Sequence, residues 1–518
     1  MNGSRDGISV CGRPALRMAV ALLCLLLTHG WVEAQVSSGG STNAQREGIL
    51  RQLEELQTMK NDLQKQVDNF NARIQALEVE LGAHPQPSAV TNQPAAVPSP
   101  PQASATAPSE EGPKNLKEPG LWGAYEPGKG FVLARTPYGE IGFGLLGYLR
   151  YLNQLSLDPT YTDAFGRTKE FDRRQDLEVN RFQIMFKGWL FSERLGYNAW
   201  VWTQNSSMGE QTQLNVGGNA WYTFYDWLTF RGGIFSMPTT RSTSQTFPNW
   251  LKIDHRTLAD EYFRGSYSTA IMLEGKVDPG VEYKVALGNH LSTLGVSAAQ
   301  LDPHLNTVAS ALWWMPTTGE FGPSMGFGDY EEHQKLATLL GVHYTYSRED
   351  KQAQPNPDGF ENTQFFLSDG TLIFSDNPFN TGGHINNLRY QMVDLEAGLK
   401  LKGWSLEGEY FIRRLDDFNV TGIIPVDHVF DHGFQVQASK MLLPKTLQTY
   451  VAPSKIFGQY GNPWELGLGL TYFPFHRKEM RINFQALYES HAAAGNVALP
   501  FQPGAQGWIY TLDMGFWF

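Results

Sequence analysis

The feature of this sequence that most constrains its fold is an alternation of apolar and polar residues with a period of two beyond about residue 130. From Val393 to Leu401 every odd-numbered residue is apolar, and every even-numbered one is charged or glycine. The alternation resumes at Trp404, so Lys402-Gly403 is expected to join two strands in a hairpin. Because successive side chains of a strand point to opposite faces, each of these strands has one apolar face.

Such a face packs against a core in a soluble sandwich or faces lipid in a membrane barrel, and the spacing of the connections favours the barrel. Expected tight turns at 192–194, 277–280, 443–445 and 473–476 alternate with expected long connections at about 152–175, 237–266, 348–387, 415–432 and 491–507. Short turns at one end and long loops at the other are typical of outer-membrane barrels. Tryptophans at the expected strand ends fit the aromatic girdles of such barrels: Trp189, Trp227, Trp313, Trp314, Trp404 and Trp464.

The last strand carries the sharpest signal. Its large apolar residues occupy alternate positions up to a carboxy-terminal phenylalanine: Trp508, Tyr510, Leu512, Met514, Phe516 and Phe518. This pattern is typical of the terminal strand that the outer-membrane barrel-assembly machinery recognises. Dividing 130–518 into hairpins gives 15 or 16 strands, and single-chain bacterial barrels have even numbers. The sequence therefore predicts an all-β fold, a 16-stranded antiparallel transmembrane β-barrel over 130–518.

A targeting segment is expected at the start of the chain. Arg13 and Arg17 precede the apolar run from Met18 to Leu27, and Val32-Glu33-Ala34 has the small-residue spacing of a signal-peptidase site. Residues 1–34 are therefore expected to be a signal peptide, which leaves a mature chain without cysteine. No later stretch holds 18 consecutive apolar residues, which argues against a membrane-spanning helix.

Residues 35–82 show a heptad repeat of apolar residues, which predicts a short α-helical coiled coil in the periplasm. One series of the seam is Ile49, Leu56, Leu63, Phe70 and Leu77, and the other is Leu53, Lys60, Val67, Ile74 and Leu81. These mixed identities leave the number of helices in the coiled coil open, although they are compatible with three. Residues 83–129 are rich in proline, alanine and serine and are expected to form an extended linker.

Parts of the barrel region resemble the phosphate-selective porin O/P family. The segment from Gly130 through Tyr151 is similar to the first strand of that family, and the segments 433–444 and 465–473 are similar to its penultimate strands. The coiled coil and linker resemble those ahead of trimeric porins for small dicarboxylates. Both resemblances imply a homotrimeric 16-stranded porin in the bacterial outer membrane. Its implied partners are outer-membrane lipid and small anionic solutes, phosphate by one resemblance and small carboxylates by the other.

In such porins the third extracellular loop folds inward and narrows the lumen, and by strand order this loop is 237–266. Candidate anion-binding residues are the cations of this loop and of the lumen-facing wall: Arg241, Lys252, Arg256, Arg264, Arg150, Arg181, Lys187 and Arg231. The alternative is that Asp254, Asp260 and Glu261 pair with the bases and make a neutral, structural loop. Net charge leaves the choice open, because 130–518 carries −9 of the total of −11 and external loops can hold that acidity.

Motifs of other functional classes are weak. The G-x-G-x-x-G match at 142–147 lies within an expected strand, and the G-x-S-x-G match at 322–326 lacks a strand-to-helix elbow. His428 and His432 lie in an expected loop without further metal ligands, so no enzyme activity, metal or cofactor is expected. The acidic balance argues against nucleic-acid binding. A second function stays open, namely a structural protein with a closed or plugged barrel whose stalk contacts peptidoglycan.

The stalk generates a first prediction. Replacing Leu63 and Phe70 with Asp places charges in the coiled-coil seam, so we expect helix association to be lost. The barrel should still fold, stay heat-modifiable on gels and conduct as wild type, because the linker separates it from the stalk. Loss of a barrel trimer in this variant would instead show that the stalk drives oligomerisation.

Overall fold

The computed structural model describes residues 65, 123–126, 130–204, 213–244, 246–294, 296, 300, 304–354, 364–496 and 498–518. The expected signal peptide (1–34), coiled coil (35–82) and linker (83–129) lie outside the described residues, apart from Lys65 and 123–126. No helix in the described ranges is long and apolar enough to cross a membrane.

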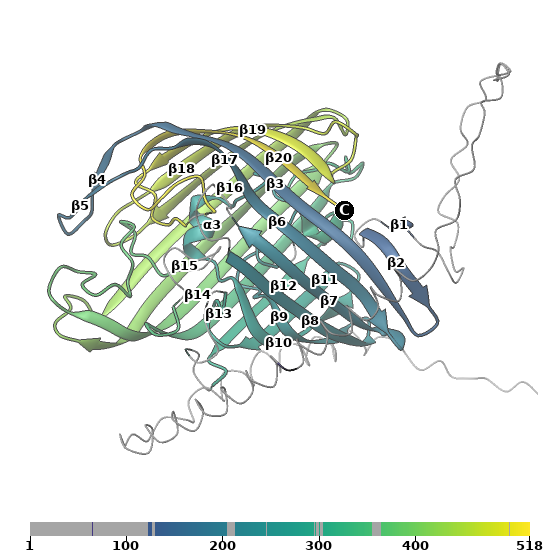
Figure 1. Ribbon diagram of the computed structural model, residues 1–518, viewed down its shortest axis with the longest axis horizontal. Coiled ribbons are helices and arrows are strands. Elements are labelled where there is room, and N and C mark those ends of the chain that lie inside the picture. The colour runs from purple at the N-terminus through teal and green to yellow at the C-terminus, as the bar shows by residue number, and fades with distance from the viewer. Residues whose placement is uncertain are drawn as a thin grey trace, which may run out of the picture. The chain divides into compact units, whose positions relative to one another are not determined.

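The described part of the barrel region confirms the expected 16-stranded antiparallel barrel. One sheet holds 18 strands, and 16 of them pair with their neighbours in chain order and close in a ring (Figure 1). These strands are β3 (Gly139–Leu157), β6 (Gln175–Leu190), β7 (Ser192–Gln204), β8 (Gln213–Tyr225), β9 (Leu228–Ser236), β10 (Tyr267–Asp278), β11 (Val281–Gly288), β12 (Thr307–Trp314), β13 (Ala337–Asp350), β14 (His384–Leu401), β15 (Trp404–Thr421), β16 (His428–Leu443), β17 (Leu447–Phe457), β18 (Trp464–Tyr472), β19 (Met480–Ser490) and β20 (Gly507–Trp517).

The ring closes where β20 pairs with β3. Their register runs from Gly507 opposite Leu157 to Trp517 opposite Leu146, and Phe518 then exchanges two backbone hydrogen bonds of 2.9 Å with Leu145. The remaining length of β3 pairs with β2 (Gly130–Thr136), which in turn pairs with β1 (Tyr125–Glu126). The opening segment from Gly130 through Tyr151 is therefore a hairpin of two strands, not one strand as expected, because the backbone turns at 137–138.

The two faces of the wall are opposite in character to those of a soluble protein. On β14 and β15 the carboxylates Asp394 and Glu407 point inward and are 0% and 1% exposed. Leu395 and Leu406 point outward and are 48% and 47% exposed. The expected hairpin between these strands is confirmed, with Lys402 and Gly403 both at positive φ as a tight two-residue turn requires. An apolar exterior around a polar interior is the arrangement of a barrel that spans a membrane.

Most connections follow the expected alternation of short and long, with two corrections. The segment 415–432 is not a long loop, because β15 and β16 extend through it and leave only 422–427 between them. Conversely, β12 and β13 are joined at the short-turn end by the long segment 315–336, which contains the 3-10 turn η3 (Pro323–Met325). The expected girdle also needs a correction, since Trp313 points inward and is 0% exposed, whereas Trp404 is 60% exposed.

The outward face generates a second prediction. Leu512 lies at the middle of β20 and faces outward, so Leu512→Arg should cost ~2–4 kcal/mol of folding free energy in a bilayer. Leu177 faces outward near the long-loop end of β6, and Leu177→Arg should cost only about 0–1 kcal/mol. Denaturant titration of both variants in lipid vesicles measures the difference. Equal costs at the two positions would contradict the depth assigned to them.

Candidate functional site: the charged loop in the barrel lumen

Loop 237–266, which joins β9 to β10, folds into the barrel and is packed against its wall. All its residues from 250 to 266 are buried. It contains the helix α3 (Leu258–Phe263), which lies within the barrel in Figure 1 and contacts β16, β17 and β18. Thr257 caps this helix, since its side chain accepts a hydrogen bond from the backbone N–H of Asp260 and donates one of 2.7 Å to Gln435. The wall also holds the helix start, because Glu465 accepts a 2.8 Å bond from the N–H of Leu258.

Arg241 lies near the start of the loop, and its guanidinium contacts two carboxylates and a backbone carbonyl. Its Nη2 is 2.5 Å from Glu407 Oε2, and its Nε is 3.7 Å from Glu396 Oε2. Nε and Nη2 donate bonds of 3.0 and 2.6 Å to the carbonyl of Met325, in the connection between β12 and β13. Arg241 therefore joins three parts of the molecule: the loop, the wall carboxylates and the inward-folded connection.

Lys252 and Asp254 tie the middle of the loop to two further strands. Lys252 Nζ forms an ion pair with Glu465 on β18. Arg150, on β3, donates bonds of 2.7 Å to Asp254 and 2.9 Å to Glu178, and all three side chains are at most 1% exposed. The wall cation Arg150 thus holds the loop in place and is occupied by two carboxylates.

Arg256 and Arg264 share the loop carboxylate Glu261, at 3.3 and 2.6 Å. The guanidinium of Arg256 also lies 4.1 Å from the ring of Trp250 and donates a 2.7 Å bond to Ser242. All four loop cations named by the sequence are therefore paired with acids. Only Arg256 and Arg264 pair with an acid of the loop itself, as the neutral-loop alternative expected, whereas Arg241 and Lys252 pair with carboxylates of the wall.

The remaining wall cations Arg181, Lys187 and Arg231 also lie on inward positions but are not gathered at one point. Arg181 lies over the rings of Trp202 and Phe247 at 5.3 and 5.2 Å. Arg231 Nε donates a 2.9 Å bond to Glu274 on β10. Lys187 lies on β6, three positions from the end of that strand.

Burial and ion pairing have opposite effects on the loop carboxylates. Burial alone would raise the pKa of Glu261, but Arg264 and Arg256 outweigh it and hold that pKa at about 2. At Asp254 burial is likewise outweighed by Arg150 and His255, so its pKa lies below the usual range. Because the pKa of Glu261 is lowered from 4.5, its contribution to stability is present above pH 4.5 and is lost as the pH falls towards 2.

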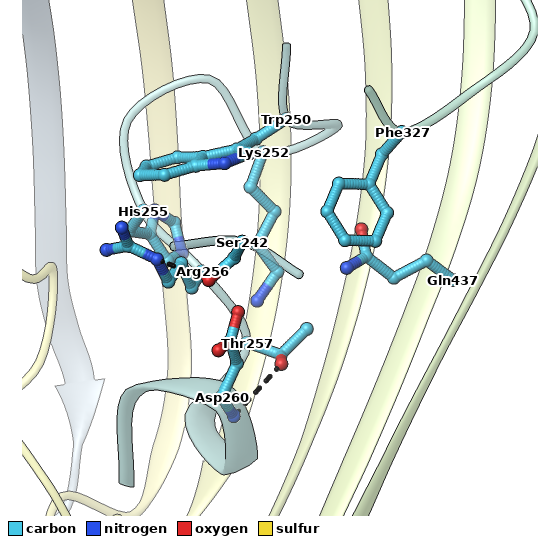
Figure 2. Close-up of a pocket in the computed structure, with 9 residues that line it drawn as sticks. All are labelled: Ser242, Trp250, Lys252, His255, Arg256, Thr257, Asp260, Phe327 and Gln437. Carbon is cyan, nitrogen blue, oxygen red and sulfur yellow. Dashed lines mark hydrogen bonds between the residues drawn. The ribbon is translucent and has the colours of Figure 1, made fainter. Parts of the chain in front are cut away.

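A small cavity lies beside the loop between these charges (Figure 2). It measures about 10 Å³, which is room for about one water molecule. Its lining residues come from the loop, from the connection between β12 and β13, and from β16: Ser242, Trp250, Lys252, His255, Arg256, Thr257, Asp260, Phe327 and Gln437. Positive and negative groups both face it, so a small polar species would meet both signs of charge there.

The sequence reasoning missed the acidic lining of the wall that receives the loop. Buried carboxylates occupy inward positions of β14, β15, β16, β18, β19 and β20: Asp394, Glu396, Glu407, Glu409, Asp431, Glu465, Glu489 and Asp513. The signal was present in the alternation, where Asp394, Glu396, Glu407 and Glu409 share one face of a predicted hairpin. The sequence could not show that these carboxylates face the basic loop, because that depends on how the strands close into a barrel.

Two further inward segments were also not anticipated. The segment 315–336 enters from the short-turn end, where Lys400 Nζ donates bonds of 2.9 and 2.5 Å to the carbonyls of Phe321 and Gly326. At the long-loop end, parts of 364–379 and 491–506 pack with α3 in one apolar cluster. Its buried members include Leu258, Phe263, Phe365, Leu367, Phe374, Ala493 and Phe501. The loop is therefore covered by protein on both sides.

The two motifs that match enzyme patterns lie in a strand and in a short turn. Residues 142–147 lie within β3, and residues 322–326 form the turn around η3. His428 and His432 are on β16, not in a loop as expected. Nδ1 of His432 and the Tyr410 hydroxyl share a hydrogen bond of 2.8 Å. Within the described ranges, no group of three or more His, Cys, Asp or Glu side chains is arranged to hold a metal ion.

Neither family models nor curated proteins match this sequence. Solved structures of barrels from the outer membrane do resemble it. An anion-selective porin from Comamonas acidovorans has 11% identity and a TM-score of 0.45, with 73% of this chain and 99% of that chain covered. OmpT of Vibrio cholerae has 9% identity and a TM-score of 0.47, covering 75% of this chain and 100% of that one. The channel DcaP of Acinetobacter baumannii has 9% identity and a TM-score of 0.44, covering 74% and 99%. Likenesses this distant identify no family, and the barrel assignment rests on the chain's own strand pairing.

Arg241 generates a third prediction. Arg241→Met removes the charge shared by Glu396 and Glu407 and leaves them buried without it, so we expect a loss of roughly 3–5 kcal/mol in the free energy of unfolding. Adding Glu407→Gln should recover part of this loss, because one uncompensated charge is then gone. Denaturant unfolding in detergent measures both variants against Arg194→Met, a control at an exposed position. An Arg241→Met cost equal to that control would contradict the anchoring role.

Proposed function

We propose that this chain is an outer-membrane channel for the passive diffusion of small solutes. The observation that carries the proposal is a closed barrel with an apolar exterior, crossed inside by a loop rich in charged residues. Barrels of this strand number have a lumen wide enough for small solutes, and loops or plugs determine what passes. Membership of the phosphate-selective porin O/P family, a homotrimer and a periplasmic stalk belong to the same proposal and rest on the sequence resemblances.

The solutes we propose are small anions, either phosphate or small carboxylates. Every loop cation has a carboxylate as its partner, and a solute with the same chemistry can replace that partner. Arg256 is the best placed, because it is one of the residues that line the small cavity, and its contact with Glu261 is longer, at 3.3 Å, than the 2.6 Å contact of Arg264 with the same carboxylate. Solutes would pass beside the loop, which folds into the lumen and is packed against the wall.

One observation favours the second candidate function, a structural protein that links the outer membrane to peptidoglycan. The lumen is packed by loop 237–266, and segments from both ends of the barrel cover this loop. A tether needs no open path, and a packed barrel would serve it as a stable anchor. Co-sedimentation with purified peptidoglycan tests this function, and deletion of 35–82 shows whether the expected stalk makes the contact.

Planar-bilayer recording provides the test of the channel and the fourth prediction. We expect conductance steps from the purified, folded protein and a reversal potential in a salt gradient that shows preference for anions. Arg256→Gln should lower the ratio of anion to cation permeability about fivefold, because a charge lost in the lumen is worth at least ~1 kcal/mol at close range. Arg194→Gln, at an exposed position of the short-turn end, is the matched control and should leave this ratio unchanged.

Three outcomes separate the alternatives. If the folded protein gives no conductance steps, the channel proposal is excluded and the structural tether is favoured. Steps with a preference for cations would remove the anionic solutes but keep the channel. An unchanged permeability ratio in Arg256→Gln would exclude this residue from the selective site.

A further inference from the structure

Three arginines lie together on the outward face of the barrel wall near its long-loop end. Arg348 on β13 is directly opposite Arg389 on β14, and Arg414 on β15 is opposite Gln391, the next outward residue of β14. Like charges directly opposite one another destabilise a sheet. Their presence on the face that meets lipid therefore calls for a compensating anion.

The protein supplies only part of that compensation. Asp416 accepts a 2.7 Å bond from Arg389 Nε at one oxygen and a 2.7 Å bond from Arg414 Nε at the other. Arg348 pairs with Asp417, so three guanidinium groups share two carboxylates. This cluster, Arg348, Arg389, Arg414, Asp416 and Asp417, carries a net charge of about +1 among the residues that its ion pairs join. The exposed carboxylate of Asp427 adds a more distant negative charge near Arg414.

The shared carboxylate also orients the two arginines. Asp416 is 9% exposed at its side chain, whereas Arg389 and Arg414 are 36% and 54% exposed. Because their Nε atoms are used by Asp416, their Nη groups are the free ends of the two guanidiniums. Among the described residues, none of these Nη groups donates a hydrogen bond to the protein. Two guanidiniums held side by side by a buried carboxylate provide the paired donors that suit a phosphate.

An apolar surface extends from this cluster towards the middle of the membrane. Phe430 is opposite Arg414 in the strand register and is 44% exposed. Farther along the same strands, Leu395 and Tyr410 are opposite each other and are 48% and 40% exposed. A ligand that fits this surface has a phosphate at one end and hydrocarbon chains at the other.

We propose that this cluster binds the phosphate of an acylated, phosphorylated lipid in the outer leaflet, with its acyl chains along Leu395, Tyr410 and Phe430. The inference rests on the proposed outer-membrane location and is independent of conduction through the lumen. The phosphate oxygens accept hydrogen bonds from the Nη groups of Arg389 and Arg414, and Arg348 adds a third positive charge. The position on the lipid-facing wall, continuous with an apolar surface, favours a lipid over free phosphate.

Native mass spectrometry of the full chain in detergent, with diphosphorylated lipid A as the probe, tests the proposal. Wild-type protein should retain this lipid, and Arg389→Gln with Arg414→Gln should weaken binding on the order of tenfold or more, because two charged donors are lost. The matched control is Arg194→Gln with Lys445→Gln, which removes two exposed charges at the short-turn end and should bind as wild type. Heat-modifiable migration on gels shows that each variant is folded.

Two measurements on wild-type protein do not depend on any variant. A dephosphorylated form of the same lipid should bind at least tenfold more weakly, and inorganic phosphate at the same concentration should not displace the lipid. Equal binding of the two lipid forms, or of the arginine variant and wild type, would overturn the proposal. Displacement by inorganic phosphate would also overturn it, in favour of a site for the free ion. Bilayer conductance of the arginine variant should equal that of wild type, so a failure of the channel proposal is detected separately.

Discussion

The structure depends on one constraint, that backbone N–H and C=O groups facing lipid must all be paired within the protein. An unpaired group in the hydrocarbon layer costs several kcal/mol, so a sheet that crosses a membrane cannot keep an open edge. Here the edges of β3 and β20 meet, and the backbone of Phe518 completes the pairing with Leu145. The carboxy-terminal strand is therefore the element that makes a ring out of fifteen consecutive hairpin pairings.

Closure of the ring creates a second requirement inside it. Inward positions of the strands are polar, and the carboxylates of β14 to β20 lie close together in a space that contains protein rather than bulk water. Buried carboxylates are stable only with partners, and loop 237–266 brings Arg241 and Lys252 to them, while Arg150 on β3 holds the loop's own Asp254. The loop therefore supplies positive charge to three of the wall carboxylates, Glu396, Glu407 and Glu465, and these ion pairs help to hold the loop across the lumen.

This interdependence affects how function is inferred from charge. A count of basic residues in the loop suggested an anion-attracting constriction, whereas each of these cations forms an ion pair with a carboxylate, either on the wall or within the loop. An anionic solute must then compete with these carboxylates for the loop cations. Selectivity therefore depends on the difference in free energy between the cation–solute pair and the cation–carboxylate pair, rather than on the net charge of the loop. On the outer wall the balance is different, because three arginines share two carboxylates and keep free donors.

The sequence by itself determined the class of fold, because side-chain alternation is a local property that can be read residue by residue. It also located the tight hairpin at Lys402-Gly403, the terminal strand and the third long loop, since turn chemistry and strand order are written along the chain. Only the tertiary structure decided which charges meet, because Arg241 and Glu407, or Arg150 and Asp254, are brought together by strands far apart in sequence. The inward course of 315–336 and the outward cluster around Asp416 were decided in the same way, as both depend on register and closure, which no local pattern contains.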